Sequence, residues 1–297
     1  MNGRRGHIVS QREEPAPGVL YVVGTPIGHL GDLSPRASAV LANVSAIACE
    51  DTRHSGQLLT SLGAQGQRFS FHQHNTQTRL PQLLQLLQAG KSLALISDAG
   101  LPGISDPGEQ LVAASRAAGL EVICIPGPCA ATTALVSSGL PSGRFCFEGF
   151  LPTKNKDRKQ RLETVANEIR TTVIYEAPHR LVQLLRELAE LCGHERPIQV
   201  ARELTKRHEQ QVGPTIAIAL QHFLEHKPVG ECTLVLGGAP APVAEEHSND
   251  HWRAELQALI DAGSSASDAA RQLAQQSGQS RRTLYALLHQ SSKDQCD

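Results

Sequence analysis

Short apolar runs recur along the first 140 residues, and loops and segments of helical spacing separate them. The stretch from Leu80 to Leu87 has helical spacing, and Ser34 followed by Pro35 is a favoured helix start. The runs predict strands at 19–23, 46–49, 69–72, 93–96 and 122–125. Continuous apolar strands separated by helices are typical of a parallel sheet with helices on both faces. We therefore expect an N-terminal α/β domain of this kind.

The pattern continues beyond Pro141 with a second set of elements. Strands are expected in "RFCFEGF", "TTVIYEA", "PIQVARE" and "CTLVLGG", and a helix is expected to begin near Pro178. The segment 215–226, "TIAIALQHFLEH", fits either a strand or a helix. These elements predict a second α/β domain.

A Pro/Ala/acidic stretch, "APAPVAEEHSND", separates these domains from a helical tail. In the tail, Gly278 divides two short helical segments, and Ser280 stands where it can cap the second, which is helix-turn-helix spacing. A packing or dimerisation helix pair is the alternative. The chain is thus divided into a flexible N-terminus (1–17), two α/β domains (18–139 and 140–240), a linker (241–249) and a tail (250–297).

Composition, net charge and cysteine content limit the kinds of protein that this chain can be. Of 297 residues 40% are apolar but only 3% aromatic, so the cores must be aliphatic. The net charge of −1 means that a nucleic-acid partner needs a local basic patch. No apolar run reaches about 18 residues and the first 17 are polar, so neither a membrane span nor a signal peptide is expected. The seven cysteines form no CxxC pair, which favours buried reduced thiols, a cytosolic protein and no metal site.

Four of the expected strands end in unusual loops: 24–32, 50–55, 97–108 and 126–133. In an open parallel sheet, ligands bind outside the carboxyl ends of the strands. The loop "SDAGLPGISDPG" is rich in glycine and proline and carries Asp98 and Asp106, which repel phosphate. It suits a ligand with a ribose diol and positive charge, and S-adenosylmethionine has both. The alternative is a tight turn whose aspartates cap the next helix.

Several motifs occur in order over residues 18–240: "VVGTPIGHLGDLSPRA", "ACEDTRHSGQLL", "SDAGLPGISDPG", "IPGPCAATTALVSSGLP", "FEGFLP", "YEAPHRL" and "ARELTKRHE". This succession resembles the tetrapyrrole-methylase superfamily, and within it the ribosomal small-subunit RNA methyltransferase I branch. The resemblance implies two α/β domains, the second with a mixed sheet, and S-adenosylmethionine bound in the cleft between them. It also implies 2′-O-methylation of a cytidine of 16S rRNA, nucleotide 1402 in the decoding centre.

The resemblance implies particular site residues. Carried over by motif, the cofactor contacts are Pro26, Ser97, Asp98, Leu101, Cys129, Ala130, Glu176 and Leu204. The branch more often has Ser at the position of Cys129, and similar families usually have an apolar residue at that of Glu176. Methyl transfer depends on alignment, and the weakly acidic 2′-hydroxyl needs a nearby base or cation. The candidates for that role are Asp51, Arg53, Arg202, Glu203 and Lys206.

A basic run at 154–161 and two arginines in the tail are candidates for phosphate contacts, although such a run is also typical of a solvated face. The predicted RNA-binding residues are Lys154, Lys156, Arg158, Lys159, Arg161, Arg281 and Arg282. The expected partners are 16S rRNA within the 30S subunit and a second copy of the chain, because similar methylases are homodimers. A small-molecule tetrapyrrole methyltransferase and a non-catalytic RNA-binding module are the two alternative functions.

Overall fold

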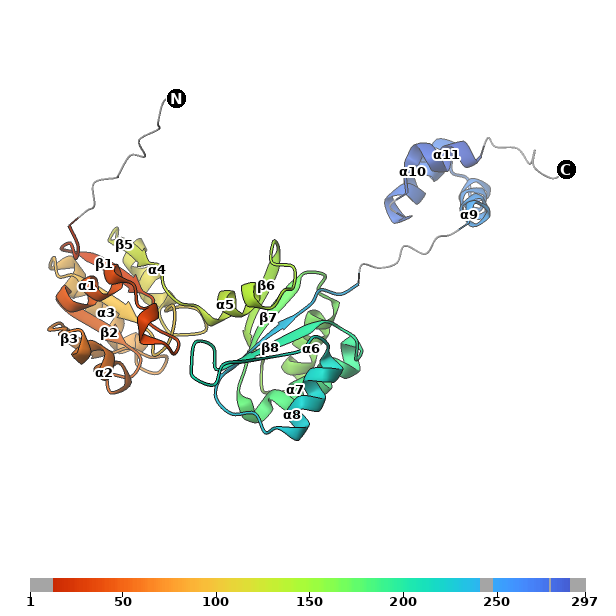
Figure 1. The fold of residues 1–297 in the computed structure, drawn as a ribbon. Helices are drawn as coiled ribbons and strands as arrows, with labels where there is room; N and C mark the ends of the chain where they lie inside the picture. Colours follow the sequence, from red (N-terminus) through yellow and green to blue (C-terminus); the bar gives the residue numbers. More distant parts are fainter. Residues whose placement is uncertain (1–12, 241–247, 278, 289–297) are drawn as a thin grey trace, which may run out of the picture. The chain divides into compact units, whose positions relative to one another are not determined.

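The computed structural model describes residues 13–240, 248–277 and 279–288. The expected N-terminus as far as residue 12, linker residues 241–247 and Cys296 lie outside the described residues. The chain divides into two compact units at residue 240, and each unit is described by itself (Figure 1).

The first sheet has five parallel strands in the order β3-β2-β4-β1-β5. Their bounds are β1 Val19–Val23, β2 Ala46–Cys49, β3 Gln67–Ser70, β4 Leu93–Ile96 and β5 Glu121–Ile125. The parallel sheet confirms the expectation from the apolar runs. Strand β3 ends two residues earlier than predicted, because the Asn75 side chain accepts a hydrogen bond from the His72 amide and turns the chain into the next helix.

Helices cover both faces of this sheet, as predicted. Their bounds are α1 Pro35–Asn43, α2 His54–Ser61, α3 Thr76–Gln88 and α4 Glu109–Ala117, with a short 3₁₀ helix η1 at Leu30–Asp32. One core joins α1 and α2 to alternate strand residues such as Tyr21, and the other joins α3 and α4 to the intervening residues such as Leu20. Ser34 caps α1 by accepting a hydrogen bond from the Ala37 amide.

The second sheet is mixed and has the order β6-β7-β10-β8-β9. Its strands are β6 Phe145–Phe150, β7 Thr171–Glu176, β8 Ile198–Arg202, β9 Gln210–Val212 and β10 Cys232–Leu236. Only β6 and β7 are parallel, and the other neighbours are antiparallel. The short strand β9 was not predicted, since three residues carry too little alternation to be recognised.

Three helices pack on one face of the second sheet, and α5 packs on the other. The helices are α5 Ala130–Ser137, α6 Asn155–Asn167, α7 Pro178–Cys192 and α8 Ile216–Glu225. The ambiguous segment 215–226 is mostly a helix, since its buried residues Ile216, Ala219 and Phe223 recur at helical spacing. A further apolar cluster joins Ile27 of the first domain, α5 and the second sheet, so the two α/β domains share a core.

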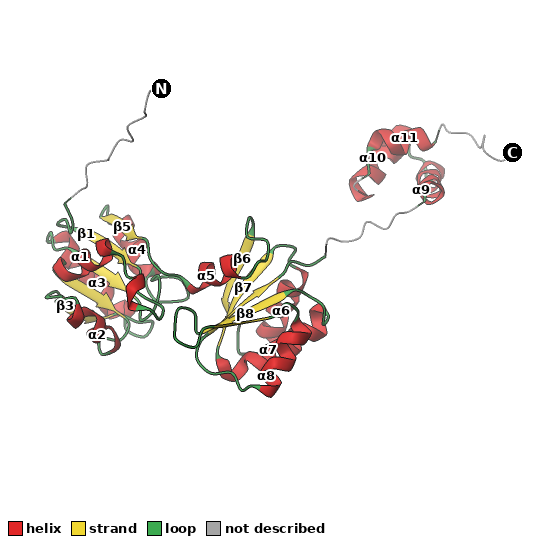
Figure 2. Cartoon of the chain, in the orientation of Figure 1, coloured by secondary structure: helices red, strands yellow, loops and turns green. Residues whose placement is uncertain are grey.

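The tail forms three helices, α9 Asn249–Asp261, α10 Ala266–Ser277 and α11 Arg281–Leu287 (Figure 2). They enclose a small core of Leu256, Ala269, Ala270, Leu273, Leu284 and Leu287. The apolar faces of α10 and α11 thus face one another. Ser280 stands at the N-cap of α11, but in the described part of the tail its side chain makes no capping hydrogen bond.

The six described cysteines are free thiols. Cys49 and Cys232 are buried, whereas Cys124 on the edge strand β5 is exposed and the other three are half-buried. The expectation of buried thiols is therefore wrong for Cys124, because an edge strand lacks a neighbour on one side. Among the described residues, no helix is long and apolar enough to cross a membrane.

Candidate active site

Two loops at the carboxyl edge of the first sheet are joined to each other by backbone hydrogen bonds. The Thr25 amide donates to the Gly100 carbonyl at 2.9 Å, and the Gly100 amide donates to the Thr25 carbonyl at 3.2 Å. The buried hydroxyls of Thr25 and Ser97 donate to carbonyls of the 97–100 turn. Gly100 has a φ of 86°, which favours glycine. The loop after β4 is thus held in one shape by the loop after β1.

The loop after β5 packs directly against the loop after β1. A Cβ atom at Gly24 would lie 2.7 Å from the Cα atom of Gly127, and one at Gly127 would lie 2.7 Å from the Cα atom of Gly24. Backbone therefore packs on backbone, which only glycine permits at both positions. The three loops form one rigid edge.

A cavity of about 360 Å³, here called the first cavity, lies between this edge and the second sheet. The loop after β4 supplies Leu101 and Ile104, the start of α5 supplies Ala130, and β7 and β10 supply Tyr175 and Thr233. The Tyr175 hydroxyl accepts a hydrogen bond of 3.0 Å from the Ala131 amide, which fixes α5 to the second sheet. Burial raises the pKa of Tyr175, so this hydroxyl stays neutral.

Two carboxylates of the loop after β4 face the first cavity, Asp98 and Asp106. Asp98 accepts a hydrogen bond of 3.3 Å from the Asp51 amide, so it is anchored to the loop after β2. Burial, assisted by the negative charge of Glu50, raises the pKa of Asp106 to about 6. A cation in this cavity would be attracted by Asp98 and would favour the ionised form of Asp106.

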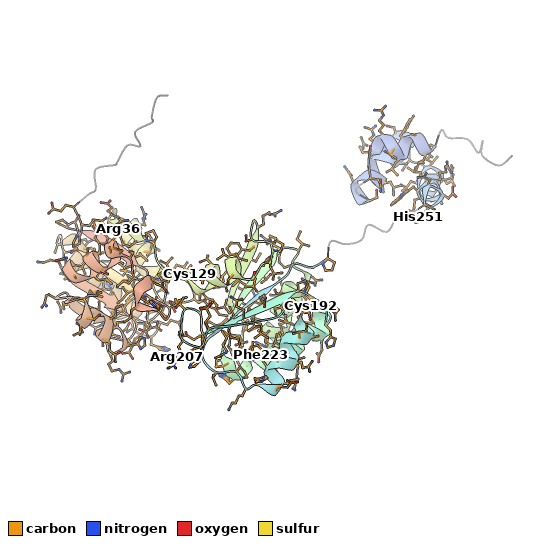
Figure 3. All side chains as sticks on the ribbon, viewed as in Figure 1. Arg36, Cys129, Cys192, Arg207, Phe223 and His251 are labelled. Carbon is orange, nitrogen blue, oxygen red and sulfur yellow. The ribbon has the colours of Figure 1, made fainter. Side chains whose placement is uncertain are left out.

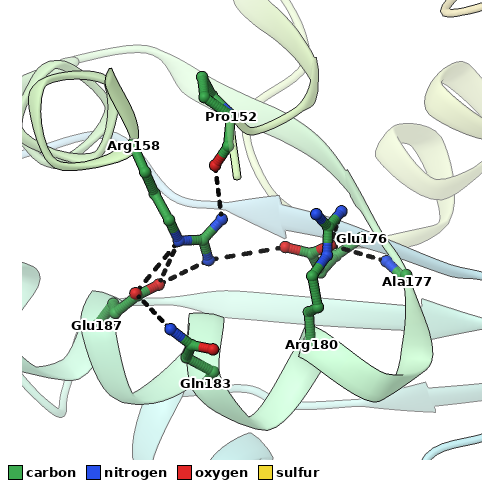
Figure 4. Close-up of polar contacts among 7 residues, drawn as sticks. All are labelled: Pro152, Arg158, Glu176, Ala177, Arg180, Gln183 and Glu187. Carbon is green, nitrogen blue, oxygen red and sulfur yellow. Dashed lines mark hydrogen bonds and ion pairs between the residues drawn. The ribbon is translucent and has the colours of Figure 1, made fainter. Parts of the chain in front are cut away.

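Glu176, at the end of β7, also lines the first cavity, and a network of charged residues holds it (Figure 4). Its side chain is fully buried. Oε1 lies 2.5 Å from Nη2 of Arg180 and accepts a hydrogen bond from the Ala177 amide, while Oε2 lies 3.7 Å from Nη2 of Arg158. Arg158 in turn pairs with Glu187 at 2.6 Å. Two arginines therefore balance and position a carboxylate that is cut off from water.

A second cavity of about 370 Å³ lies beside the first. The two share four lining residues: Ile27, Asp98, Ala99 and Glu231. Lys206 lines the second cavity, and its Nζ lies 2.7 Å from Oε2 of Glu231 and 2.9 Å from Oε1 of Glu203. Although burial acts in the opposite direction, these two carboxylates raise the pKa of Lys206. A permanent positive charge therefore stands next to the shared wall.

The structure places most of the predicted cofactor residues around these cavities. Those that line one or both are Pro26, Ser97, Asp98, Leu101, Cys129, Ala130 and Glu176. Cys129 is the N-cap residue of α5 (Figure 3) and makes no side-chain capping bond within the described residues. Leu204 lines neither cavity and lies instead in the core shared by the two domains, where it packs in the same cluster as Ile27.

Of the five candidates for the base or cation, only Lys206 lines a cavity. Hydrogen bonds from Arg53 hold the pKa of Asp51 below its usual range, so Asp51 is a weak base. Arg202 is bonded to Gln210 and to the carbonyls of residues 208 and 229, which makes it a brace between loops. Glu203 accepts a hydrogen bond from the Glu231 amide and pairs with Lys206.

Among the predicted RNA contacts, Arg158 has to be corrected. It is only 7% exposed, because it lies on the buried face of α6 and pairs with Glu187 and Glu176. It is not available to a phosphate. The other four basic residues of the run are exposed: Lys154, Lys156, Lys159 and Arg161. In the tail, Arg281 and Arg282 are exposed, and Arg281 donates to the Ser267 hydroxyl.

Sequence reasoning missed the contribution of β10 and of α2. Gly230, Glu231, Cys232 and Thr233 line the first cavity, and His54, Ser55, Gln57, Leu58 and Ser61 line the second. The stretch "EDTRHS" drew attention to the start of α2, but the turns that follow it carry no motif. The described residues hold no group of three or more His, Cys, Asp or Glu side chains that could bind a metal ion.

Known proteins resemble the chain in sequence. A family model described as Tetrapyrrole (Corrin/Porphyrin) Methylases matches residues 19–219. A protein of Synechocystis sp. named ribosomal RNA small subunit methyltransferase I is 50% identical over 91% of this chain and 97% of its own length. Proteins of the same name from Xylella fastidiosa and Escherichia coli O157:H7 are 44% and 45% identical, over 91% and 78% of this chain and 98% and 82% of their own lengths.

Solved structures agree on the fold. The methyltransferase CobJ has a TM-score of 0.58 at 21% identity, covering 75% of this chain and 95% of its own. A uroporphyrin-III C-methyltransferase of Thermus thermophilus, complexed with S-adenosylhomocysteine, has a TM-score of 0.51 at 19% identity, covering 74% and 96%. The expected two-domain methylase fold is thereby confirmed. The chain belongs to the tetrapyrrole methylase family, and within it to the branch of the ribosomal RNA small subunit methyltransferase I proteins.

Proposed function

We propose that this protein transfers a methyl group from S-adenosylmethionine to the ribose 2′-hydroxyl of a cytidine in 16S rRNA, nucleotide 1402 of the decoding centre. The observation that carries the proposal is the first cavity, in which two carboxylates face a space between two sheets of a methylase fold. The relatives named above supply the substrate class, since they share 44–50% of their residues with this chain. An rRNA substrate would place the enzyme in the cytoplasm.

The first cavity fits S-adenosylmethionine in size and in chemistry. Its volume of about 360 Å³ lies within the range of small-molecule sites. Asp98 and Asp106 match a ligand that carries positive charge, and Ile27, Leu101 and Ile104 offer apolar surface for a purine. When bound, the cofactor supplies a methyl carbon on a positively charged sulfur, which is a good leaving group without protonation.

The residues of the shared wall would then act on the acceptor hydroxyl. Lys206 stays protonated, so it stabilises developing negative charge on the 2′-oxygen rather than accepting its proton. Glu231 reaches both cavities and lies next to Lys206, so its carboxylate is a candidate proton acceptor in that wall, together with Asp98. The rigid loop edge holds the two binding partners in line, which is the main contribution to catalysis of methyl transfer.

The proposed RNA contacts are two separate sets of exposed basic residues: Lys154, Lys156, Lys159 and Arg161 in the run, and Arg281 and Arg282 in the tail. They would contact phosphates without reading sequence. We leave Arg158 out of this set because it is buried. The proposal includes the assembled 30S subunit as substrate and a homodimer as the active form, which sedimentation would detect at twice the chain mass of 31.9 kDa.

The test is methyl transfer from radiolabelled S-adenosylmethionine to three acceptors: 30S subunits, free 16S rRNA and a tetrapyrrole. We expect incorporation into 30S subunits, with the label mapped by nuclease digestion and mass spectrometry to a 2′-O-methylcytidine. Incorporation only into the tetrapyrrole would identify a small-molecule methyltransferase. Binding of RNA without any transfer would identify a non-catalytic RNA-binding module.

A further inference from the structure

The second cavity opens on the same wall as the first, and two of the predicted cofactor contacts, Pro26 and Ser97, line it and not the first cavity. Of its lining, Ile27, Asp98, Ala99 and Glu231 are shared with the first cavity, and the rest comes from the loops after β1 and β4, from α2 and from Lys206. Methyl transfer requires the attacking oxygen and the methyl carbon to lie about 3–3.5 Å apart. An acceptor must therefore enter a space that touches the donor across this wall.

We propose that the second cavity binds the target nucleoside of a polyribonucleotide, turned out of its strand, with the ribose at the shared wall. This inference rests on the proposed function and names the part of the protein that receives its substrate. A volume of about 370 Å³ is at the small end of ligand sites, so it holds a single nucleoside rather than a run of bases or a tetrapyrrole ring. Enzymes that act on a single nucleotide commonly extrude it into such a pocket.

The lining of the cavity matches a nucleoside in polarity. Helix α2 presents Ser55, Gln57 and Ser61 with the apolar Leu58 between them. The Ser55 hydroxyl is buried and makes no regular hydrogen bond to any described residue, while the Cys49 thiol lies beside it as a weak partner. A carboxamide such as that of Gln57 both donates and accepts, as the edge of a cytosine requires. Hydrogen-bonding groups are therefore available to a base.

The rim of the cavity matches a ribonucleotide chain. Leu30 of η1 is 69% exposed and lines the opening, where it offers apolar contact to a neighbouring base. Arg53, directly before α2, has a side chain that is 90% exposed, and its Nε and Nη2 atoms donate to the Asp51 carboxylate at 3.2 and 2.8 Å. A phosphate at this rim would therefore meet an exposed arginine that already has a carboxylate partner. Lys206 stands at the inner wall, on the side of the first cavity. Positive charge is thus present both outside and inside the pocket.

The experiment fills the cavity with a large side chain. Gln57→Trp places an indole in the second cavity, and Thr60→Trp is the matched control, because Thr60 is exposed on the same helix and lines neither cavity. Methylation of 30S subunits is measured with each variant, and affinity for S-adenosylmethionine is measured by calorimetry. We expect Gln57→Trp to lower kcat/KM for 30S subunits at least tenfold with unchanged cofactor affinity, and Thr60→Trp to match the wild type.

Each other result overturns the inference in a distinguishable way. Full activity of Gln57→Trp on 30S subunits means that the acceptor binds elsewhere, while the proposed function stands. A parallel loss of cofactor affinity in Gln57→Trp assigns the second cavity to the methyl donor. If the wild-type protein methylates no RNA, both the inference and the proposed function are wrong.

Discussion

Replacing Arg158 by methionine tests whether the network around Glu176 stabilises the fold and the cofactor site. Glu176 is 1% exposed, and its Oε2 lies 3.7 Å from Nη2 of Arg158. Methionine keeps the apolar stem that packs on α7 but removes the charge. The Glu176 carboxylate then keeps Arg180 at 2.5 Å and the Ala177 amide, both on Oε1.

The size of the effect follows from these distances. Two charges 3.7 Å apart attract by about 4–5 kcal/mol at an effective dielectric constant of about 20. The pair between Arg158 and Glu187, at 2.6 Å, is lost as well, but the Glu187 side chain is 25% exposed and regains water. The buried guanidinium also no longer has to be dehydrated, so the net cost is smaller than the attraction alone. We therefore expect Arg158→Met to lower the free energy of unfolding by about 2–3 kcal/mol, near the lower limit for a broken buried pair.

Thermal and urea unfolding measure this change. For a unit of this size, about 2–3 kcal/mol corresponds to a fall in Tm of roughly 4–12 °C. Lys159→Met is the control on the exposed face of α6. The reasoning is refuted if Arg158→Met and Lys159→Met unfold within about 0.5 kcal/mol of each other.

The remaining predictions concern binding. Asp98→Asn should weaken S-adenosylmethionine binding by about 1–3 kcal/mol in calorimetry, as for a lost charged acceptor, and unchanged affinity would contradict its role. Because the pKa of Asp106 is raised to about 6, its carboxylate is increasingly ionised above that pH and favours a cation. Affinity for S-adenosylmethionine relative to the uncharged sulfur of S-adenosylhomocysteine should thus rise between pH 5 and 7.5, and Asp106→Asn should abolish the rise. Four exposed basic residues are exchanged together for Gln in a further variant: Lys154, Lys156, Lys159 and Arg161. The variant should show a flatter salt dependence of RNA binding than the wild type, whereas equal slopes for the two proteins would indicate a merely solvated face. Deleting residues 245–297 should preserve cofactor affinity and reduce methylation at limiting 30S concentration, and full activity there would exclude a role of the tail in substrate capture.

The first sheet was predictable because its inner strands β1, β2 and β4 are apolar on both faces and stand out from their loops. A strand such as 93–96 is buried on every side, so its sequence is continuously apolar. The glycine- and proline-rich loop that follows it marked the ligand edge, since few other sequences tolerate the positive φ of Gly100 and the close approach of Gly24 to Gly127. The composition of this loop and its position at the carboxyl end of a strand therefore predicted the same ligand-binding edge.

The sequence contains a pattern that predicts the burial of Arg158, but the many charged residues around it made the whole run look exposed. Arg158, Leu162 and Val165 recur at helical spacing, and all three are buried on one face of α6. Within a run of eight mostly charged residues, the position in the helix decides which side chain is solvated. Its partners Glu176 and Glu187 lie on other elements, so only the folded chain shows that the buried charge is balanced.

The wall between the two cavities was beyond sequence reasoning, because its residues come from distant segments. Ile27 follows β1, Asp98 follows β4, and Glu231 precedes β10 more than a hundred residues later. A change at any of these three touches both cavities, so it must alter donor and acceptor binding together and leaves their roles unresolved. Leu101 and Gln57 each line one cavity alone. Variants at these two positions therefore separate donor binding from acceptor binding, whereas Asp98→Asn should change both, and calorimetry with S-adenosylmethionine alone reads only its effect on the donor.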